Sequence, residues 1–293
     1  MNNYLRKPEW LKSKKLGATK AQSIIKYLRE YNLHTVCESA KCPNQGECFE
    51  RGTATFMILG EVCTRNCTFC AVEKGRNKLL PPDPQEPESI AKLAKKLNLK
   101  HIVITTVTRD DLPDGGASQF VKTLNKIREI CDSDVSTEVL ISDLKGDSEQ
   151  LEKIIKAAPD ILNHNVETVP RLYPEVRPLA NYQRSLKILE TSRKLNKNLI
   201  TKSGLMLGLG EKKDEVLSLM EDLIKVGVDI LTIGQYMQPS LKHHPVVEYV
   251  HPEIFKYYGL VGEKMGFKIV ESAPLVRSSY HAERARKLFK ERR

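Results

Sequence analysis

Residues 55–70 read Thr-Phe-Met-Ile-Leu-Gly-Glu-Val-Cys-Thr-Arg-Asn-Cys-Thr-Phe-Cys, an apolar run that leads directly into a loop with three cysteines. The run Thr55–Gly60 predicts a first buried strand. Beyond it, short apolar runs alternate with segments whose apolar residues recur three and four positions apart, as in amphipathic helices. We expect strands at 101–107, 135–141, 161–166, 199–207, 228–233 and 267–270, and helices at 86–97, 116–131, 148–157, 182–195, 213–226 and 252–265.

Strands that alternate with helices of this length imply parallel βαβ units with right-handed crossovers. Such a series either closes into a barrel or forms an open sheet with helices on both faces, and periodicity does not decide between them. Both architectures place their chemistry at the carboxyl ends of the strands. The cysteine loop follows the first strand and therefore occupies that position.

The three cysteines of this loop, Cys63, Cys67 and Cys70, are close enough in sequence to wrap one small inorganic cluster. Soft thiolate ligands suit an iron–sulfur cluster or zinc. A cubane held by three thiolates leaves one iron open to a cofactor or substrate. A zinc site would need a histidine as its fourth ligand, and none lies suitably near in the sequence.

Segment 61–70, with Phe69 directly before the third cysteine, resembles the signature of the radical S-adenosylmethionine (SAM) superfamily. The resemblance implies a [4Fe-4S] cluster on the three cysteines, whose open iron chelates the amino and carboxylate groups of SAM. An electron passed through that cluster would cleave SAM to methionine and a 5′-deoxyadenosyl radical. In such enzymes the cofactor supplies the chemistry and the protein positions it.

A second triplet, Cys37-x4-Cys42-x5-Cys48, is similar to that of the lipoyl synthase family in particular, as are the segments 164–168, 203–211, 234–239 and 277–280. This resemblance implies an auxiliary [4Fe-4S] cluster on Cys37, Cys42 and Cys48, with a C-terminal serine as its fourth ligand. We expect that serine to be Ser279, with Ser278 as the alternative. The auxiliary cluster would itself be the sulfur donor.

The implied activity is that of a radical SAM sulfurtransferase, which inserts sulfur at C6 and C8 of a protein-bound octanoyl-lysine to form the lipoyl cofactor. A radical is needed because an unactivated alkyl carbon has no acidic proton for a base to remove. The family also implies an α/β fold, a partial (β/α)6 barrel at 55–271. An N-terminal extension at 1–54 would carry the auxiliary cysteines. A C-terminal extension at 272–293 would carry the serine ligand and a basic helix.

Six residues at or near predicted strand ends are candidate SAM contacts: Asn165, Glu167, Arg177, Gly208, Gly210 and Glu211. Amide and carboxylate groups suit ribose hydroxyls, a guanidinium fork suits a carboxylate, and glycines permit close backbone approach. Structural roles compete with these, namely a polar pair, a loop salt bridge and a tight turn. No catalytic residue is expected beyond the clusters and SAM. Three histidines without metal-ligand spacing are interpreted as loop or surface residues: His243, His244 and His251.

The composition of the 293 residues, 40% hydrophobic and 29% charged, is typical of a folded globular protein. No apolar leader or membrane-spanning run is evident, and seven cysteines without an export signal favour a reducing compartment, by default the cytoplasm. The net charge of +10 resides at the ends, since basic residues exceed acidic ones by seven in 1–29 and by four in 281–293. An acidic partner or simple solvation accounts for these basic ends equally well.

The family resemblance implies octanoylated lipoyl carrier domains as partners, such as E2 subunits of 2-oxoacid dehydrogenases and the glycine cleavage H protein. It also implies a ferredoxin- or flavodoxin-type electron donor and an iron–sulfur cluster carrier. Neither a nucleic acid nor a membrane is expected as a partner. A zinc-stabilised nucleic-acid-binding protein is the alternative from another class, but only 6% of residues are aromatic and no basic stripe runs through the body. A two-cluster electron carrier would be expected to have four cysteines per cluster.

Overall fold

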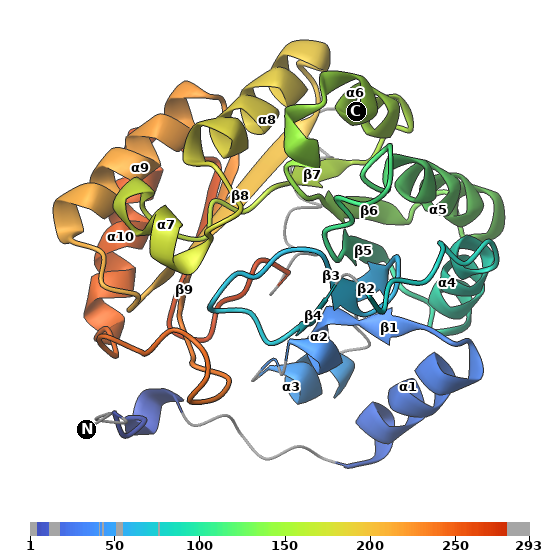
Figure 1. The fold of residues 1–293 in the computed structure, drawn as a ribbon, viewed down its shortest axis with the longest axis horizontal. Coiled ribbons are helices and arrows are strands. Elements are labelled where there is room, and N and C mark those ends of the chain that lie inside the picture. Colours follow the sequence, from blue (N-terminus) through green and yellow to red (C-terminus); the bar gives the residue numbers. More distant parts are fainter. Residues whose placement is uncertain are drawn as a thin grey trace. The chain divides into compact units, whose positions relative to one another are not determined.

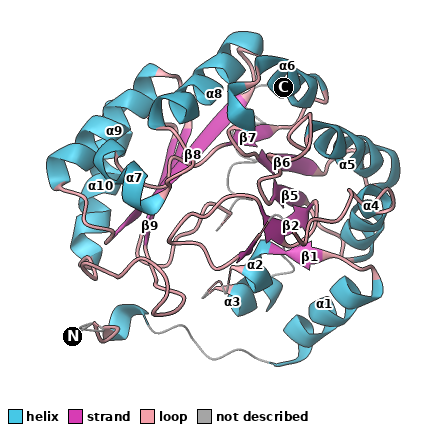
Figure 2. Cartoon of the chain, viewed as in Figure 1, coloured by secondary structure: helices cyan, strands magenta, loops and turns pink. Residues whose placement is uncertain are grey.

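The computed structural model describes residues 5–11, 18–40, 42, 44–50, 55–75 and 77–279. Tyr280 and the basic helix predicted beyond it lie outside these residues, as do some of the basic residues near the N-terminus. The alternation of strands and helices is present in the predicted order (Figure 1), and Figure 2 shows it as magenta arrows between cyan coils.

The predicted strands are β2 (Thr55–Ile58), β5 (His101–Thr106), β6 (Ser136–Leu140), β7 (Ile161–Asn163), β8 (Ile200–Leu207), β9 (Ile230–Gln235) and β10 (Ile269–Ser272). The predicted helices are α4 (Glu86–Lys96), α5 (Ala117–Ile130), α6 (Ser148–Lys156), α8 (Tyr182–Leu195), α9 (Lys213–Lys225) and α10 (Pro252–Met265). Helix α1 (Ala18–Glu30) precedes these elements. Short elements that periodicity did not predict are η1 (Glu9–Leu11), β1 (His34–Thr35), α2 (Val36–Ser39), α3 (Gln45–Glu50), β3 (Val62–Cys63), β4 (Glu73–Lys74), η2 (Leu144–Gly146), η3 (Pro170–Leu172) and α7 (Tyr173–Val176).

Local sequence explains where several helices begin and end. The Asp147 carboxylate accepts hydrogen bonds from the backbone of Glu149 and Gln150 at 2.9 and 3.2 Å, which satisfies free N–H groups at the start of α6. Helix α10 begins at a proline. Proline has no backbone N–H, but the first N–H groups of a helix have no acceptor within the helix, so no hydrogen bond is lost there. It ends at Gly266, whose φ of 105° is left-handed and favours glycine.

The chain forms two compact units. The N-terminal unit comprises the described residues of 15–65 and 72–162 together with Ser279, and the C-terminal unit those of 1–14, 66–71 and 163–278. The boundary passes through β7 and through the cysteine loop, so Cys63 belongs to the N-terminal unit and Cys67 and Cys70 to the C-terminal unit.

In the N-terminal unit, β2, β5 and β6 are parallel neighbours, and β1 pairs antiparallel with β2. Thr55 lies opposite Val103, and His101 opposite Ser136. Strand β2 is fully buried, and α4 and α5 lie along this part of the sheet (Figure 1). Because the strands are parallel, β2, β5 and β6 end at one edge, where β2 leads into the cysteine loop.

In the C-terminal unit, β9 lies between β8 and β10, and all three are parallel. Their apolar side chains pack with those of α8, α9 and α10 in one core that includes Leu205, Ile233, Met220 and Phe255. No described helix is long and apolar enough to span a membrane.

Strand β7 is shorter than the predicted 161–166, because the chain leaves the regular ladder after Asn163. Glu167 has a φ of 66°, a left-handed conformation that costs free energy in a residue other than glycine. The backbone N–H of Glu167 donates to Gly204 O at 2.9 Å and its carbonyl accepts from Met206 N at 2.9 Å, which holds this turn against β8. The last strand begins two residues later than predicted, at Ile269.

Candidate functional site

The first part of the cysteine loop is held to the end of β5 within the N-terminal unit. The backbone N–H and the hydroxyl of Thr64 both donate to Thr108 O at 2.9 Å. Gly75 N donates to Cys63 O at 3.2 Å, and Arg65 N donates to Cys63 Sγ at 3.4 Å. The sulfur of Cys63 therefore has a fixed direction.

The second part of the loop is held within the C-terminal unit. Thr68 N donates to Val176 O at 2.9 Å, and Thr68 O accepts from His244 N at 2.9 Å. The Nε2 atom of His243 lies 3.1 Å from Cys70 O, and because a carbonyl only accepts, Nε2 carries the proton. Phe69 packs against the core of this unit.

Both of these histidines lie in a loop, as the sequence predicted. His244 is buried there, with only 7% of its surface exposed. Its Nε2 donates to Leu209 O at 3.0 Å, and its Nδ1 lies 3.3 Å from a Glu175 oxygen. Contacts to the cysteine loop come from residues about 170 positions downstream, which no local pattern could indicate. His251 caps α10 by accepting from Glu253 N at 3.4 Å.

The chemistry of the donor set fits an iron–sulfur cluster. Cys63, Cys67 and Cys70 are partly exposed cysteines outside any disulfide on one continuous loop, and their thiolates are the soft ligands that such a cluster needs. Among the described residues no three His, Cys, Asp or Glu side chains converge on a single metal ion. In a cubane each thiolate binds a different iron, so convergence on one point is not required.

The second triplet lies in the N-terminal unit on two short helices and the link between them. Cys37 is on α2, Cys48 is on α3, and Cys42 N donates to Cys37 O at 3.0 Å. Burial, and then the charge of Cys42, raises the pKa of the Cys37 thiol to about 12, although a hydrogen bond from the Thr55 backbone opposes this. A buried thiol of this kind becomes a thiolate when a metal replaces its proton.

The predicted serine ligands lie at the end of the described chain, in a turn after β10. Ser278 and Ser279 are both partly buried, and neither is distinguished as the ligand. The segment that leads to them crosses β9 closely, because Gln235 N donates to Pro274 O at 3.1 Å.

Three of the candidate SAM contacts come together in the C-terminal unit. Asn165 Nδ2 donates to Glu167 Oε1 at 3.1 Å, and Arg177 Nη1 donates to the carbonyls of Asn165 and Val166 at 3.1 and 3.0 Å. Burial raises the pKa of the Glu167 carboxyl, although the positive charges of Arg177 and Arg277 oppose the shift. The polar pair and the guanidinium are therefore one cluster.

Two atoms of this cluster, Asn165 Oδ1 and Arg177 Nε, are buried without a hydrogen-bond partner among the described residues, as are Thr168 Oγ1 and Ser203 Oγ in the same unit. A buried polar atom of this kind costs free energy unless water or a ligand satisfies it. Donors and acceptors without partners suit a polar cofactor such as SAM.

The remaining candidates form the turn after β8. Gly208 and Gly210 have left-handed φ values of 94° and 108°. A Cβ at position 208 would lie 2.2 Å from Gln235 Nε2 and 2.4 Å from Glu248 O, so packing alone requires glycine there. Glu211 accepts hydrogen bonds from the backbone of Gly208 and Leu209 at 2.6 and 2.9 Å. Its carboxylate thus holds the turn.

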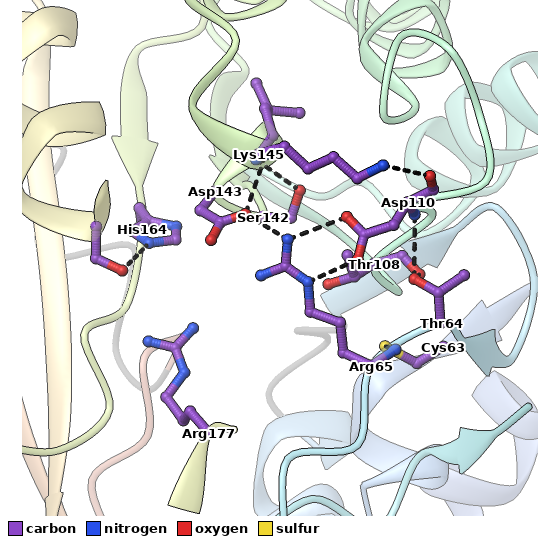
Figure 3. A network of polar contacts seen from close by, with 12 residues as sticks. Cys63, Thr64, Arg65, Thr108, Asp110, Ser142, Asp143, Lys145, His164 and Arg177 are labelled. Carbon is purple, nitrogen blue, oxygen red and sulfur yellow. Dashed lines mark hydrogen bonds and ion pairs between the residues drawn. The ribbon is translucent and has the colours of Figure 1, made fainter. Parts of the chain in front are cut away.

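A network that the sequence did not predict surrounds the side chain of Arg65, between the first two loop cysteines. Its guanidinium contacts Asp110 and Asp143, which follow β5 and β6 (Figure 3). Within the C-terminal unit, the Nε2 atom of His164 lies 3.0 Å from Ser185 Oγ.

Residues 57–223 match the family model of the radical SAM superfamily. Two solved structures resemble this chain at low sequence identity. Methylornithine synthase (PylB) has a TM-score of 0.58 and 14% identity, covering 73% of this chain and 63% of its own. Streptococcus suis SuiB bound to S-adenosylmethionine has a TM-score of 0.57 and 12% identity, covering 79% and 53%. These matches define the class and confirm the predicted α/β fold, the partial barrel of radical SAM enzymes.

Among curated proteins, the lipoyl synthase of Caldanaerobacter subterraneus subsp. tengcongensis is 53% identical over 95% of this chain and 96% of its own length. That of Aquifex aeolicus is 54% identical over 91% of this chain and 96% of its own length. The chain belongs to the lipoyl synthase family. Radical SAM membership implies SAM and a [4Fe-4S] cluster, and the three cysteines of the loop, Cys63, Cys67 and Cys70, fit that cluster.

Proposed function

We propose that this enzyme inserts sulfur at C6 and C8 of a protein-bound octanoyl-lysine and so forms the lipoyl cofactor. The observation that carries the proposal is the second set of three cysteines outside any disulfide, Cys37, Cys42 and Cys48, in a chain that already has the radical SAM loop. A radical generator alone needs only one triplet. A second cluster gives the substrate radical a source of sulfur.

We propose that Cys63, Cys67 and Cys70 hold the SAM-binding cluster, and that Cys37, Cys42, Cys48 and Ser279 hold the auxiliary one, with Ser278 as the alternative serine. Bound SAM and its cluster supply the 5′-deoxyadenosyl radical that removes hydrogen from the octanoyl chain. An oxygen ligand among soft thiolates is the weakest corner of the auxiliary cluster, which suits a cluster that is dismantled.

The chain's own residues would bind and orient SAM. Arg177 and Glu167 offer opposite charges within one buried cluster, which suits a zwitterionic ligand with hydroxyl groups. Asn165, with an acceptor oxygen that lacks a partner, suits a ribose hydroxyl. Gly208, Gly210 and Glu211 are the other proposed cofactor contacts, and room for close approach is at Gly210, where an added Cβ would meet only Val247 Cγ2, at 3.5 Å.

The proposed macromolecular partners are octanoylated lipoyl carrier domains, a ferredoxin- or flavodoxin-type electron donor and an iron–sulfur cluster carrier, all at a cytoplasmic location. We also propose that 1–54 and 272–293 act as extensions of a catalytic barrel at 55–271.

The test supplies anaerobically purified enzyme with SAM, a reductant and an octanoylated carrier domain, and follows the carrier by mass spectrometry. We expect two sulfur atoms in the carrier and 5′-deoxyadenosine in solution. If 5′-deoxyadenosine forms but no sulfur enters, the enzyme is another radical SAM protein, with biotin-synthase-like insertion as the next candidate. Colourless protein that contains zinc would contradict the iron–sulfur assignment altogether.

A further inference from the structure

Arg65 is the one basic residue between Cys63 and Cys67, and its side chain is only 5% exposed. Its Nε and Nη2 donate to the two oxygens of Asp110 at 2.9 and 3.0 Å. Nη2 also lies 2.5 Å from Asp143 Oδ1, on a carboxylate that is fully buried (Figure 3). A buried cation between two carboxylates is stable only if its geometry is kept, so this contact restrains the loop strongly.

Both carboxylates are themselves held in place. Asp110 N donates to the Thr64 hydroxyl at 3.1 Å, and Asp110 O accepts from Lys145 Nζ at 2.7 Å. Asp143 accepts from Lys145 N at 3.1 Å. Residues from the ends of β5 and β6 therefore form a rigid receptor for one side chain of the cysteine loop.

The turn that presents Asp143 is strained. Leu144 and Lys145 have φ values of 45° and 54°, two consecutive left-handed residues that are not glycine. Such strain persists only where surrounding contacts impose it, and it is concentrated at functional sites. The hydrogen bonds that Lys145 makes to both aspartates are the contacts that impose it here.

The contacts of the Arg65 side chain also affect the sulfur of Cys63. The peptide N–H of Arg65 donates to Cys63 Sγ at 3.4 Å, so the clamp on the Arg65 side chain also fixes the peptide that points at a cluster ligand. Hydrogen bonds to the sulfurs of an iron–sulfur cluster favour its more negative, reduced state and raise its reduction potential.

We propose that Arg65 is a positioning residue of the SAM-binding cluster. Held by Asp110 and Asp143, it fixes the Cys63 end of the loop, slows loss of iron and raises the reduction potential of the cluster. This inference rests on the proposed cluster at Cys63, Cys67 and Cys70. It goes beyond the ligands, because it proposes that the ion pairs of Arg65 with Asp110 and Asp143 hold the ligands in their geometry.

The decisive variant is Arg65→Lys, which keeps the positive charge but lacks the fork that reaches both aspartates. Arg65→Met removes the charge as well. Arg193→Lys is the matched control, since Arg193 also pairs with a buried carboxylate, Asp229 at 2.6 Å, and has no contact with the cysteine loop among the described residues.

Each loaded enzyme is titrated electrochemically while the EPR signal that changes on addition of SAM is followed, and iron loss to a chelator is timed. We expect Arg65→Lys to shift the potential to more negative values and to lose iron several-fold faster, with a larger shift in Arg65→Met. Arg193→Lys should lose thermal stability without either change. Hydrogen exchange at residues 63–65 of the same samples should accelerate only in the Arg65 variants.

The inference is overturned if Arg65→Lys has the potential, iron-loss rate and exchange of the unmodified enzyme, or if the control changes in the same way. If Arg65→Met does not fold, Arg65→Lys still decides, because it retains the charge and most of the side chain. Failure of the proposed cluster at Cys63, Cys67 and Cys70 looks different, because the unmodified enzyme would then show no EPR signal that responds to SAM. Failure of sulfur insertion alone leaves that signal and is seen only in the carrier assay.

Discussion

Gly234 in β9 lies beneath the segment that leads to Ser278 and Ser279. A Cβ at this position would be 2.0 Å from Val276 O and 3.0 Å from Val276 C. Real Cβ contacts are essentially never closer than 3.0 Å, so in Gly234→Ala the backbone at Val276 must move by at least the difference, 1.0 Å. The obstacle is a main-chain carbonyl, which cannot rotate away as a side chain could.

Overpacking of this kind costs about 1–3 kcal/mol of unfolding free energy. The functional loss should be of similar size, because misplacement of a reacting group by 1 Å can reduce a rate by about 100-fold, which corresponds to about 2.7 kcal/mol. We therefore expect Gly234→Ala to lower sulfur insertion by about 10- to 100-fold, while 5′-deoxyadenosine formation is largely retained. Mass spectrometry of the carrier and chromatography of deoxyadenosine measure the two outcomes in one reaction.

Gly259→Ala in α10 is the matched control. Its added Cβ would meet only Ser272 Cβ, at an ordinary 3.7 Å, and alanine is favoured over glycine in a helix interior by about 0.5–1 kcal/mol. If Gly234→Ala unfolds at the same denaturant concentration as Gly259→Ala and inserts sulfur equally well, the close approach does not position the serine segment.

Three further outcomes are expected, two at the cysteine clusters and their contacts and one at Glu86, the first residue of α4. Cys67→Ala should abolish SAM cleavage, whereas Cys42→Ala should retain it and lose sulfur insertion, and equal loss of both activities in both variants would contradict two separate clusters. His243→Leu removes the donor to the Cys70 carbonyl and should release iron to a chelator faster than His243→Gln, which keeps an N–H donor; equal rates would exclude this contact as an anchor. Burial raises the pKa of Glu86, against hydrogen bonds from Gln119 and the Leu59 backbone. A raised carboxyl pKa stabilises the fold at acidic pH and loses that contribution as pH rises. In urea titrations of metal-free chain, the stability of the unmodified protein relative to Glu86→Gln should therefore be greater at pH 5 than at pH 8, and a constant difference would refute the shift.

The regular elements could be predicted because their periodicity is a local property. Strands such as β5, buried along nearly its whole length, and helices such as α10, with proline at its start and glycine after its end, carry their own signals. The end of β7 could not be predicted in this way. The predicted strand runs to the apolar Val166, but the chain leaves the ladder after Asn163, and Glu167, which bridges to Leu205, has a left-handed conformation.

The candidate ligands were equally local, since two and three residues between cysteines define the loop. The groups that hold the loop were not. Asp110 and Asp143 lie 45 and 78 residues from Arg65, and His243 lies 173 residues from Cys70. Without the fold, no sequence pattern could identify the partners of an isolated arginine and of a histidine in a loop.

This separation has a consequence for how the site works. Sequence spacing sets which atoms ligate the cluster, and long-range hydrogen bonds set how firmly they are held and what their sulfurs accept. Within the cysteine loop the regular secondary structure is the short strand β3. The rigidity of the loop therefore depends on contacts with Thr108, Asp143, Val176 and His243. Substitution of a cysteine should therefore change how much iron binds. Substitution of the residues that hold the loop should leave the initial iron content unchanged. It should instead alter the reduction potential of the cluster and the rate at which iron is lost.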